Sequence, residues 1–409
     1  MSEWRRVKLS ECCQSIADGD HQPPPKAETG IPFVTISNMT STNQFDFGDT
    51  LFVPQQYYDS LDDKRKAKKN DILYSVVGSF GIPVFMKEDK EFVFQRHIAI
   101  LRPNEEEIVP RFLFYTMLTR DFYAKADAAA IGAAQRTVSL TALRNMEIDI
   151  PAKELQCRIV DILSAYDDLI DNNQKQIMLL EEATQRLYKE WFVELRFPGY
   201  ESVRMVDGVP EEWEMVSLDD VIQKITTGLN PRKNFVLGKG NNYYVTIKNM
   251  GENNIYLDDK CDKIDDEALE KINRRSDLRT GDILFSGIGT MGRVYLISIP
   301  TNNWNVSESV FTIRANDRIT NEYLYLVLLS DDMKSYCDQN AHGAAQRGIR
   351  MADLRAYKFL LPPQGILNEF TMFANPLIKK VQSLQHQKKD LTEARDRLLP
   401  KLMSGEIEL

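Results

Sequence analysis

Several side chains in this sequence could do chemistry, but their spacing does not match a known reaction. Residues 287–292 (Gly-Ile-Gly-Thr-Met-Gly) match the glycine pattern that holds a dinucleotide pyrophosphate. The next residues, 293–297, read as a strand and not as the helix that such a loop requires, which favours a glycine-rich hairpin or loop. The run 88–90 (Glu-Asp-Lys) resembles a nuclease carboxylate–lysine pair, but a solvated turn is the simpler interpretation. The sequence also lacks a phosphate-binding lysine loop, a nucleophile elbow and a zinc-binding His-Glu-x-x-His helix.

The histidines and cysteines also give no indication of an active site. The four histidines are scattered and do not recur, and the five cysteines lack the paired spacings of a zinc site or a disulfide framework. We therefore expect free thiols, no metal site and no catalytic residues in this chain.

Polar side chains on loops are better suited to reading DNA. Lysine and arginine would contact phosphates, whereas asparagine, glutamine, serine and arginine would contact base edges. Our candidates for DNA contact are His21, Lys26, Asn38, Ser79, Arg136, Arg232, Lys248, Asn249, Arg293 and Arg347. Two alternatives stay open: Asn38 and Asn249 could cap a turn, and Arg136 and Arg347 could belong to a structural junction.

These candidates lie in a sequence that contains an internal repeat. Residues 33–39, 71–75 and 132–136 recur at 244–250, 282–286 and 343–347, each at an offset of 211. The last pair is unchanged, Gly-Ala-Ala-Gln-Arg in both copies. Because this period is far too long for a solenoid unit, it indicates two whole domains of one fold. Two similar modules suit a target that has two parts.

Each copy begins as a mixed α+β module. Tryptophan-containing strands are expected at 4–9 and 213–218, followed by glycine- and proline-rich loops at 18–25 and 227–233. Further strands are predicted at 33–36, 71–77, 91–101, 243–247 and 306–313. One helical segment follows in each copy, at 110–123 and 321–336.

A long helix with a heptad pattern ends each copy. The residues expected to pack the helices together are Ile159, Ile162, Tyr166, Leu169, Leu180, Leu187, Phe370, Phe373, Leu377, Leu384, Leu391 and Leu398. Polar interruptions are predicted at Asn173, Gln176, Lys380 and Gln387. Each narrow apolar stripe alone would be marginal, so we predict an antiparallel pair with a pseudo-two-fold axis. The alternative is a dimerisation stalk.

The domain boundaries follow from this order. We predict a first recognition domain at 1–150, a helical spacer at 151–197, a second recognition domain at 198–361 and a second spacer at 362–409. Net charge is −9, but nucleic acid responds to local fields, and basic clusters occur at 64–69, 232–233 and 274–275. No apolar run is long enough to span a bilayer, so no membrane association and a cytoplasmic location are expected.

The doubled order of module and helix resembles the specificity subunit of a type I restriction-modification system. The resemblance covers the whole chain and is carried by residues 31–39 and 70–75, the repeated Gly-Ala-Ala-Gln-Arg, and residues 398–407. It implies an α+β fold with two tandem α/β target recognition domains and two long antiparallel coiled-coil helices in a pseudo-two-fold internal repeat.

The resemblance also implies a function and partners. The chain would bind an asymmetric, bipartite site on double-stranded DNA without being catalytic, and its helical spacer would set the gap between half-sites. It would assemble with two methyltransferase subunits that use S-adenosylmethionine to methylate adenine, and two restriction subunits that use ATP with Mg could join. This chain itself would bind no cofactor.

Two other classes of function remain. One is a non-catalytic two-headed adaptor that joins two protein ligands across a coiled-coil spacer. The other is an intrinsic nuclease or methyltransferase, which the lack of a repeated acid–base set disfavours.

Overall fold

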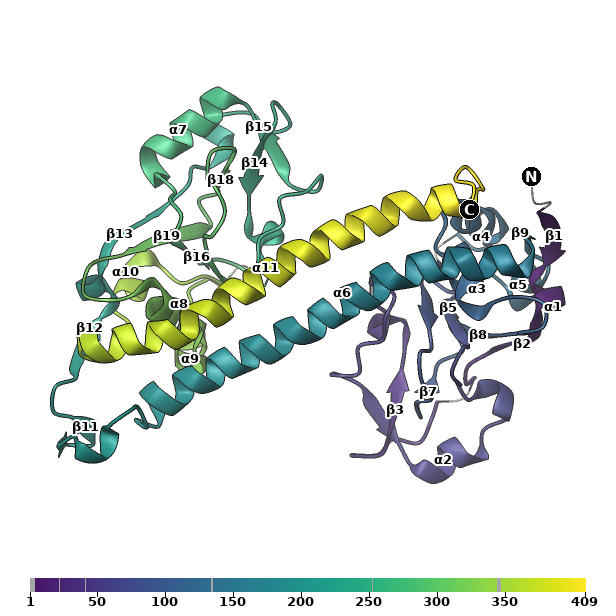
Figure 1. Cartoon of the computed structure of the whole chain (residues 1–409), viewed down its shortest axis with the longest axis horizontal. Helices are drawn as coiled ribbons and strands as arrows, with labels where there is room; N and C mark the ends of the chain where they lie inside the picture. The colour runs from purple at the N-terminus through teal and green to yellow at the C-terminus, as the bar shows by residue number, and fades with distance from the viewer. Residues whose placement is uncertain (1–3, 22, 41, 134, 252, 344–346) are drawn as a thin grey trace. The chain divides into compact units, whose positions relative to one another are not determined.

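The computed structural model of the chain describes residues 4–21, 23–40, 42–133, 135–251, 253–343 and 347–409 (Figure 1). The chain divides into two compact units. Unit 1 comprises Met1–Ile170 and Asp390–Leu409, and unit 2 comprises Asp171–Lys389. Each unit holds one α/β module together with parts of two long helices, α6 (Lys153–Tyr188) and α11 (Gln364–Met403).

The module of unit 1 is built on three small sheets. A four-stranded antiparallel sheet has the order β2-β8-β5-β6, a three-stranded sheet has the order β4-β3-β7, and β1 pairs with β9. The strands are β1 (Arg5–Lys8), β2 (Cys13–Asp18), β3 (Ile31–Val34), β4 (Leu51–Val53), β5 (Ile72–Ser75), β6 (Pro83–Phe85), β7 (Val93–Phe94), β8 (Ile98–Pro103) and β9 (Glu147–Ile150). All four residues of β5 are buried, as expected of a strand inside a sheet covered on both faces.

The module of unit 2 repeats this topology strand for strand. Its sheets have the orders β13-β19-β16-β17, β15-β14-β18 and β12-β20, and a small hairpin, β10-β11, precedes them. The strands are β10 (Met205–Val206), β11 (Val209–Pro210), β12 (Glu214–Ser217), β13 (Ile222–Thr227), β14 (Asn242–Val245), β15 (Asp262–Ile264), β16 (Ile283–Ser286), β17 (Val294–Leu296), β18 (Trp304–Val306), β19 (Val310–Ala315) and β20 (Lys358–Leu361). The predicted duplication of an α/β module is therefore confirmed.

Short helices complete the two modules. In unit 1 they are α1 (Leu9–Cys12), η1 (Ile36–Asn38), α2 (Gln55–Ser60), η2 (Asp63–Arg65), α3 (Pro110–Met117), α4 (Arg120–Ala129) and α5 (Leu140–Arg144). In unit 2 they are η3 (Lys189–Val193), η4 (Tyr200–Ser202), η5 (Leu218–Val221), η6 (Pro231–Lys233), η7 (Ile247–Asn249), α7 (Asp266–Ser276), α8 (Asn321–Leu329), α9 (Asp331–Gln339) and α10 (Met351–Arg355).

Each predicted helical segment is in fact two helices. The break falls at Thr119 in unit 1 and at Ser330 in unit 2, where the side-chain hydroxyl accepts a hydrogen bond from a backbone N–H of the following helix. Such capping starts a new helix in place of continuing the old one. The predicted strands 91–101 and 306–313 are likewise interrupted, because turns separate β7 from β8 and β18 from β19.

The buried seams of the two long helices have the same seven-residue register. Its first positions are Gln156, Leu163, Ile170, Ile177, Thr184 and Trp191 along α6 and η3, and Leu367, Ala374, Val381, Lys388, Arg395 and Leu402 along α11. The two sets differ by the repeat offset of 211. In unit 2, Ile177 of α6 packs on Val381 and Leu384 of α11. Because the first half of one helix meets the last half of the other, the pair is antiparallel.

Three of the predicted packing residues lie beside the buried seam. Leu169 and Phe373 are 49% and 55% exposed, and Ile162 is only partly buried. Their neighbours Ile170, Ala374 and Leu163 occupy the seam positions. Phe373 still contacts the other helix, because its ring lies 6.0 Å from the ring of Trp191. Two adjacent apolar residues leave a heptad pattern ambiguous by one position, which explains the error. The remaining predicted packing residues are buried or half-buried: Ile159, Tyr166, Leu180, Leu187, Phe370, Leu377, Leu384, Leu391 and Leu398.

The prediction of polar residues on the seams agrees with the structure on α6 but not on α11. Asn173 is buried on the seam as expected, and Gln176 is half-buried. On α11, however, Lys380 and Gln387 are exposed, and the polar seam residues are Lys388 and Arg395.

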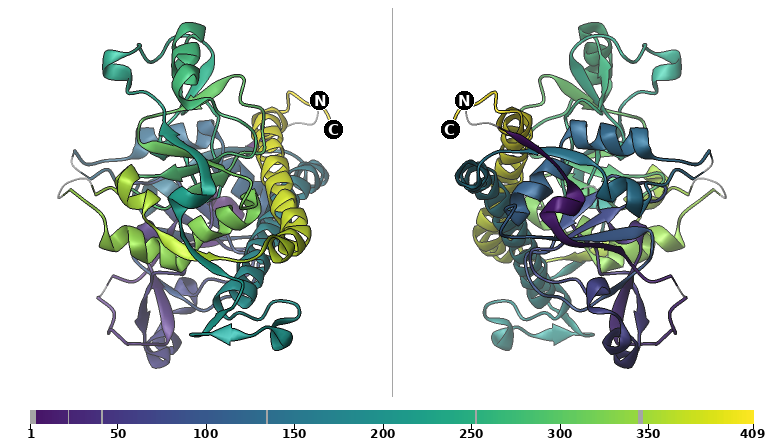
Figure 2. Two further views of the ribbon diagram at one scale, coloured as in Figure 1. Left: turned by 90° about the vertical axis from the view of Figure 1, so that its left-hand side faces the viewer. Right: turned by 90° about the vertical axis from the view of Figure 1, so that its right-hand side faces the viewer.

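Unit 1 brings together segments from both ends of the chain. Leu399 and Leu402 of α11 belong to the same apolar core as Val7 of β1 and Ile159 of α6. The start of β1 and the end of α11 lie close together in Figure 2. Within the described ranges, no helix combines the length and the apolarity needed to cross a bilayer.

Candidate nucleic-acid interface

Two repeated motifs that are distant in sequence meet in each module. In unit 1 the Gly78 N–H donates to the Arg136 carbonyl at 2.9 Å, and in unit 2 the Gly289 N–H donates to the Arg347 carbonyl at 2.8 Å. Both glycines have a positive φ, 67° and 75°, which explains why glycine occupies this turn. The glycine loop and the arginine that ends the Gly-Ala-Ala-Gln-Arg motif are therefore adjacent in each module.

A buried serine shapes each glycine loop. The Ser75 hydroxyl donates to the Ser79 carbonyl at 3.0 Å, and the Ser286 hydroxyl donates to the Thr290 carbonyl at 2.6 Å. Ser79 itself is exposed at the tip of the loop. Its side chain therefore stays available for a contact.

The arginines of the repeated motif are anchored. Arg136 pairs with Asp127 and lies over the Phe80 ring, while Arg347 donates to the Asp338 carbonyl at 2.7 Å. Both side chains are nonetheless exposed on their outer side. These contacts fix the arginine side chains and keep positive charge at the surface. The motif residues Ala134, Ala344, Ala345 and Gln346 lie outside the described residues.

Asn38 and Asn249 are not available for DNA contact, which corrects the prediction. Their side chains are 9% and 6% exposed. Their Oδ1 atoms accept the backbone N–H of Thr35 at 2.9 Å and of Thr246 at 3.0 Å. The capping alternative therefore describes both residues.

Lys248 and Arg293 lie beside the asparagine cap of unit 2. Lys248 is exposed, one residue before the buried Asn249. Arg293 is half-buried, and its guanidinium donates to the carbonyls of Ile247 and Met250. It thus ties the η7 turn to the β16–β17 hairpin and adds positive charge there.

The loop after the first strand of each four-stranded sheet needs a glycine. A Cβ on Gly19 would lie 2.1 Å from the Phe94 carbonyl oxygen, and one on Gly228 would lie 1.6 Å from the Val306 carbonyl oxygen. His21, Lys26 and Arg232 are exposed on these two loops. His21 is bonded to Asp18 at 2.7 Å.

Basic residues that were not among our candidates flank the same loops. Arg65 approaches Asp18 at 4.0 Å in unit 1. In unit 2, Arg275 donates to the Thr227 hydroxyl at 3.1 Å and Lys271 to the Asn234 carbonyl at 3.0 Å. The basic clusters 64–69 and 274–275 contain Arg65 and Arg275, whereas Lys271 lies outside the clusters.

A buried ion pair supports the framework of each module. Asp71 pairs with Arg102 at 2.9 Å, and Asp282 pairs with Arg314 at 2.7 Å. Both aspartates are 1% exposed. They explain the repeated Asp-Ile-Leu motif, whose role the sequence did not reveal. Among the described residues, no group of three or more His, Cys, Asp or Glu side chains could hold a metal ion.

The family of the chain follows from comparison with known proteins. The type I restriction modification DNA specificity domain family matches residues 1–182 and 210–393. The chain belongs to this family. It is 24% identical over 476 aligned residues to the type I restriction enzyme HindI specificity subunit of Haemophilus influenzae, with 100% of both chains covered. It is 25% identical to the MjaIX specificity subunit of Methanocaldococcus jannaschii, covering 75% of this chain and 71% of that protein.

A solved structure supports the fold. The crystal structure of a type I restriction-modification S subunit from M. genitalium matches with a TM-score of 0.62 at 16% identity, covering 98% of this chain and 96% of that one. The chain is thus a DNA specificity protein of a type I restriction-modification system, and the adaptor hypothesis has no comparable support.

Proposed function

We propose that each module reads one half of a split DNA target. The observation that carries this proposal is that the two modules share one framework but expose different side chains on it. Ser79 in unit 1 corresponds to Thr290 in unit 2, and Ser37 corresponds to Lys248, by the offset of 211, and all four residues are exposed. Because base readout depends on the exposed groups, the two half-sites differ and the target is asymmetric.

The exposed residues divide by chemistry. Lys26 on a loop, Arg232 on η6 and Lys248 on η7 are exposed cations that suit phosphate oxygens. Ser79, His21 and the outer edges of Arg136 and Arg347 can hydrogen-bond to bases or phosphates. Their supply of positive charge at the loops offsets the net charge of −9 of the chain.

The chain supplies recognition, and its partners supply catalysis. In this proposal two methyltransferase subunits bind S-adenosylmethionine and methylate adenine, and two restriction subunits using ATP with Mg can join them. No catalytic group of this chain takes part. The sequence offers no repeated acid–base set that a reaction in both modules would use.

Sequencing of methylated adenines tests this function. Cells with the methyltransferase subunit are compared with and without this chain, and modified adenines are expected at a single split site only when the chain is present. A chain that carries His21→Ala and Lys26→Ala, two exposed residues of the first module, serves as the matched variant, and it should change only one half-site. Methylation that ignores the chain, or a loop change that alters both half-sites, contradicts the proposal.

A further inference from the structure

The two ends of the helix pair differ in one small group of residues. In unit 1, the Asp167 carboxylate on α6 accepts from the Tyr115 hydroxyl at 2.6 Å and from Arg395 of α11 at 2.9 Å. The side chains of Asp167 and Arg395 are only 14% and 25% exposed. Burial and the neighbouring carboxylate raise the pKa of Tyr115, so its hydroxyl remains a donor. We call these three residues the charged node.

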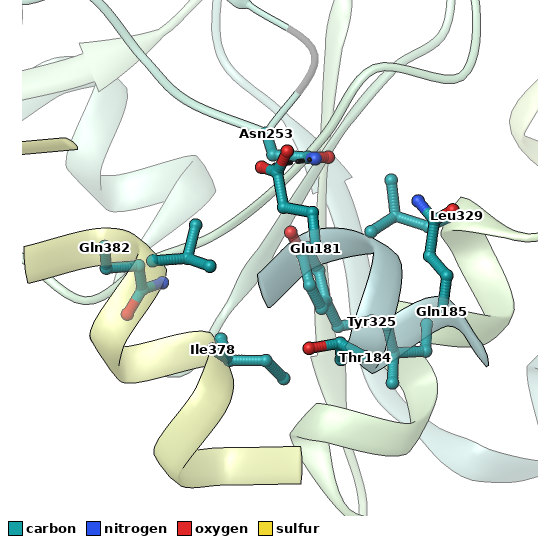
Figure 3. Close-up of a pocket in the computed structure, with 10 residues that line it drawn as sticks. Glu181, Thr184, Gln185, Asn253, Tyr325, Leu329, Ile378 and Gln382 are labelled. Carbon is teal, nitrogen blue, oxygen red and sulfur yellow. Dashed lines mark hydrogen bonds between the residues drawn. The ribbon is translucent and has the colours of Figure 1, made fainter. Parts of the chain in front are cut away.

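The equivalent positions in unit 2 carry no charge. The offset of 211 maps the charged node onto Leu326, Ile378 and Thr184. All three are buried, and the Thr184 hydroxyl donates to the Leu180 carbonyl of its own helix at 2.7 Å. They line a cavity of about 20 Å³, shown in Figure 3, with Thr184 and Ile378 on the two facing helices.

A second difference lies at the helix ends in unit 2. Phe192 packs against Tyr323 and Phe370 with ring centroids 4.5 and 4.7 Å apart, and Trp191 lies 5.6 Å from Phe370. The positions equivalent to Trp191 and Phe192 in unit 1 are Leu402 and Met403, where Leu402 is 2% exposed. The pocket that holds these smaller side chains in unit 1 would be overpacked by two large rings.

We propose that two features make the helix pairing selective: the charged node, and the aromatic cluster formed by Trp191, Phe192, Tyr323 and Phe370. The first half of α6 accepts the last half of α11 and rejects a second copy of α6, so the two halves of this chain associate with each other and not with themselves. The helix surface that each half of the chain presents therefore binds the other half of the chain.

The reason is the register of the pair. In a dimer of two first halves, Thr184 of one copy would replace Arg395 opposite Asp167, leaving the mostly buried carboxylate without its cation. In a dimer of two second halves, Arg395 would face Ile378. Removing one partner of a buried ion pair is strongly unfavourable.

The test begins from the folded, intact chain. A protease site is inserted between Asp207 and Gly208, the tip of the β10–β11 hairpin, where both residues have a positive φ and a Cβ on Gly208 would meet no atom within 4 Å. Light and isotopically heavy preparations are cut with the protease, mixed and warmed so that the halves can exchange. Native mass spectrometry then measures the masses of the pairs that form. We expect at least a tenfold excess of mixed pairs over pairs of identical halves. A statistical distribution of pairs overturns the proposal.

Charge variants tie the result to the charged node. Asp167→Arg should reduce the excess of mixed pairs at least tenfold, and adding Arg395→Asp should restore it. Arg397→Asp makes the same charge change on a side chain of α11 that is 81% exposed, and it should have no effect. Should the cut halves not exchange, thermal unfolding of the intact chain decides. There Asp167→Arg lowers the midpoint and Arg395→Asp recovers it, and failure of that recovery overturns the proposal.

Discussion

At the scale of single residues, exposure to solvent distinguishes side chains that can contact DNA from side chains that support the fold. Lys248 and Asn249 are adjacent, but the lysine is exposed and the asparagine caps the η7 turn. Lys248→Ala should weaken DNA binding and lower the slope of log affinity against log salt by about 1, with unchanged stability. Asn249→Ala should lower the free energy of unfolding by about 1 kcal/mol, as the loss of a cap does. Salt titration of binding and denaturant unfolding measure the two effects. Equal effects of both variants on unfolding would contradict this division.

His97 gives a second residue-scale prediction, on pH. Burial, and then the adjacent Arg96, lower the pKa of His97 below 6.5. Below pH 6.5 the unfolded chain therefore binds a proton that the folded chain resists, so stability falls as pH drops through that value. Above pH 6.5 both states are neutral and the effect vanishes. Thermal unfolding between pH 5 and pH 8 should show a flatter profile for His97→Gln than for the unchanged protein. Identical profiles would show that His97 does not contribute.

The roles of individual residues were predictable from the sequence in some cases and not in others. The exposed loop cations could be chosen from residue type and position, because charged side chains in glycine- and proline-rich loops are solvated. The asparagines could not be separated from base-reading groups, since an amide that caps a turn and an amide that reads adenine look alike in sequence. The buried pairing of Asp71 with Arg102 depends on two strands meeting in a sheet, which sequence spacing alone does not show.

At the scale of elements, the helix pair is the clearest test of packing. Leu384 is 2% exposed on the seam of unit 2, in contact with Ile177. Leu384→Ala should lower the free energy of unfolding by about 2–5 kcal/mol through lost burial and a cavity. Met372→Ala is the matched control on the same helix, because Met372 is 76% exposed, and it should change stability by less than about 0.5 kcal/mol. Urea unfolding measures both variants, and a large effect at Met372 would place the seam elsewhere.

The elements were predictable where a period was strong. Heptads identified both long helices, but not which of two adjacent apolar residues faces the partner, as Leu169 and its half-buried neighbour Ile170 show. The shorter helices and strands came out too long. A single Thr119 or Ser330 hydroxyl starts a new helix, and such a local hydrogen bond outweighs the apolar pattern on either side of it.

At the scale of the whole molecule, the duplication was the feature that sequence revealed most fully. The two modules, the two long helices and their shared register all follow from the constant offset of 211, because each copy must fold to the same framework. What the offset hides is the difference between copies. Tyr115, Asp167 and Arg395 in one unit and Leu326, Ile378 and Thr184 in the other occupy matching positions, and only packing across two helices reveals that each set forms one cluster.

The last prediction concerns the helices as a spacer between the two half-sites. Gln174 and Lys388 face each other, so seven residues inserted after Lys175 in α6 and seven after His386 in α11 keep the seam in register. Each helix gains about 10 Å at 1.5 Å per residue, and the accepted gap between half-sites should grow by about 3 base pairs at 3.4 Å each. Methylation mapping in cells measures the gap. Inserting seven residues in α6 alone is the control, and it should destabilise the protein because facing residues no longer match. A gap that stays the same after the double insertion would show that the helices do not set the spacing.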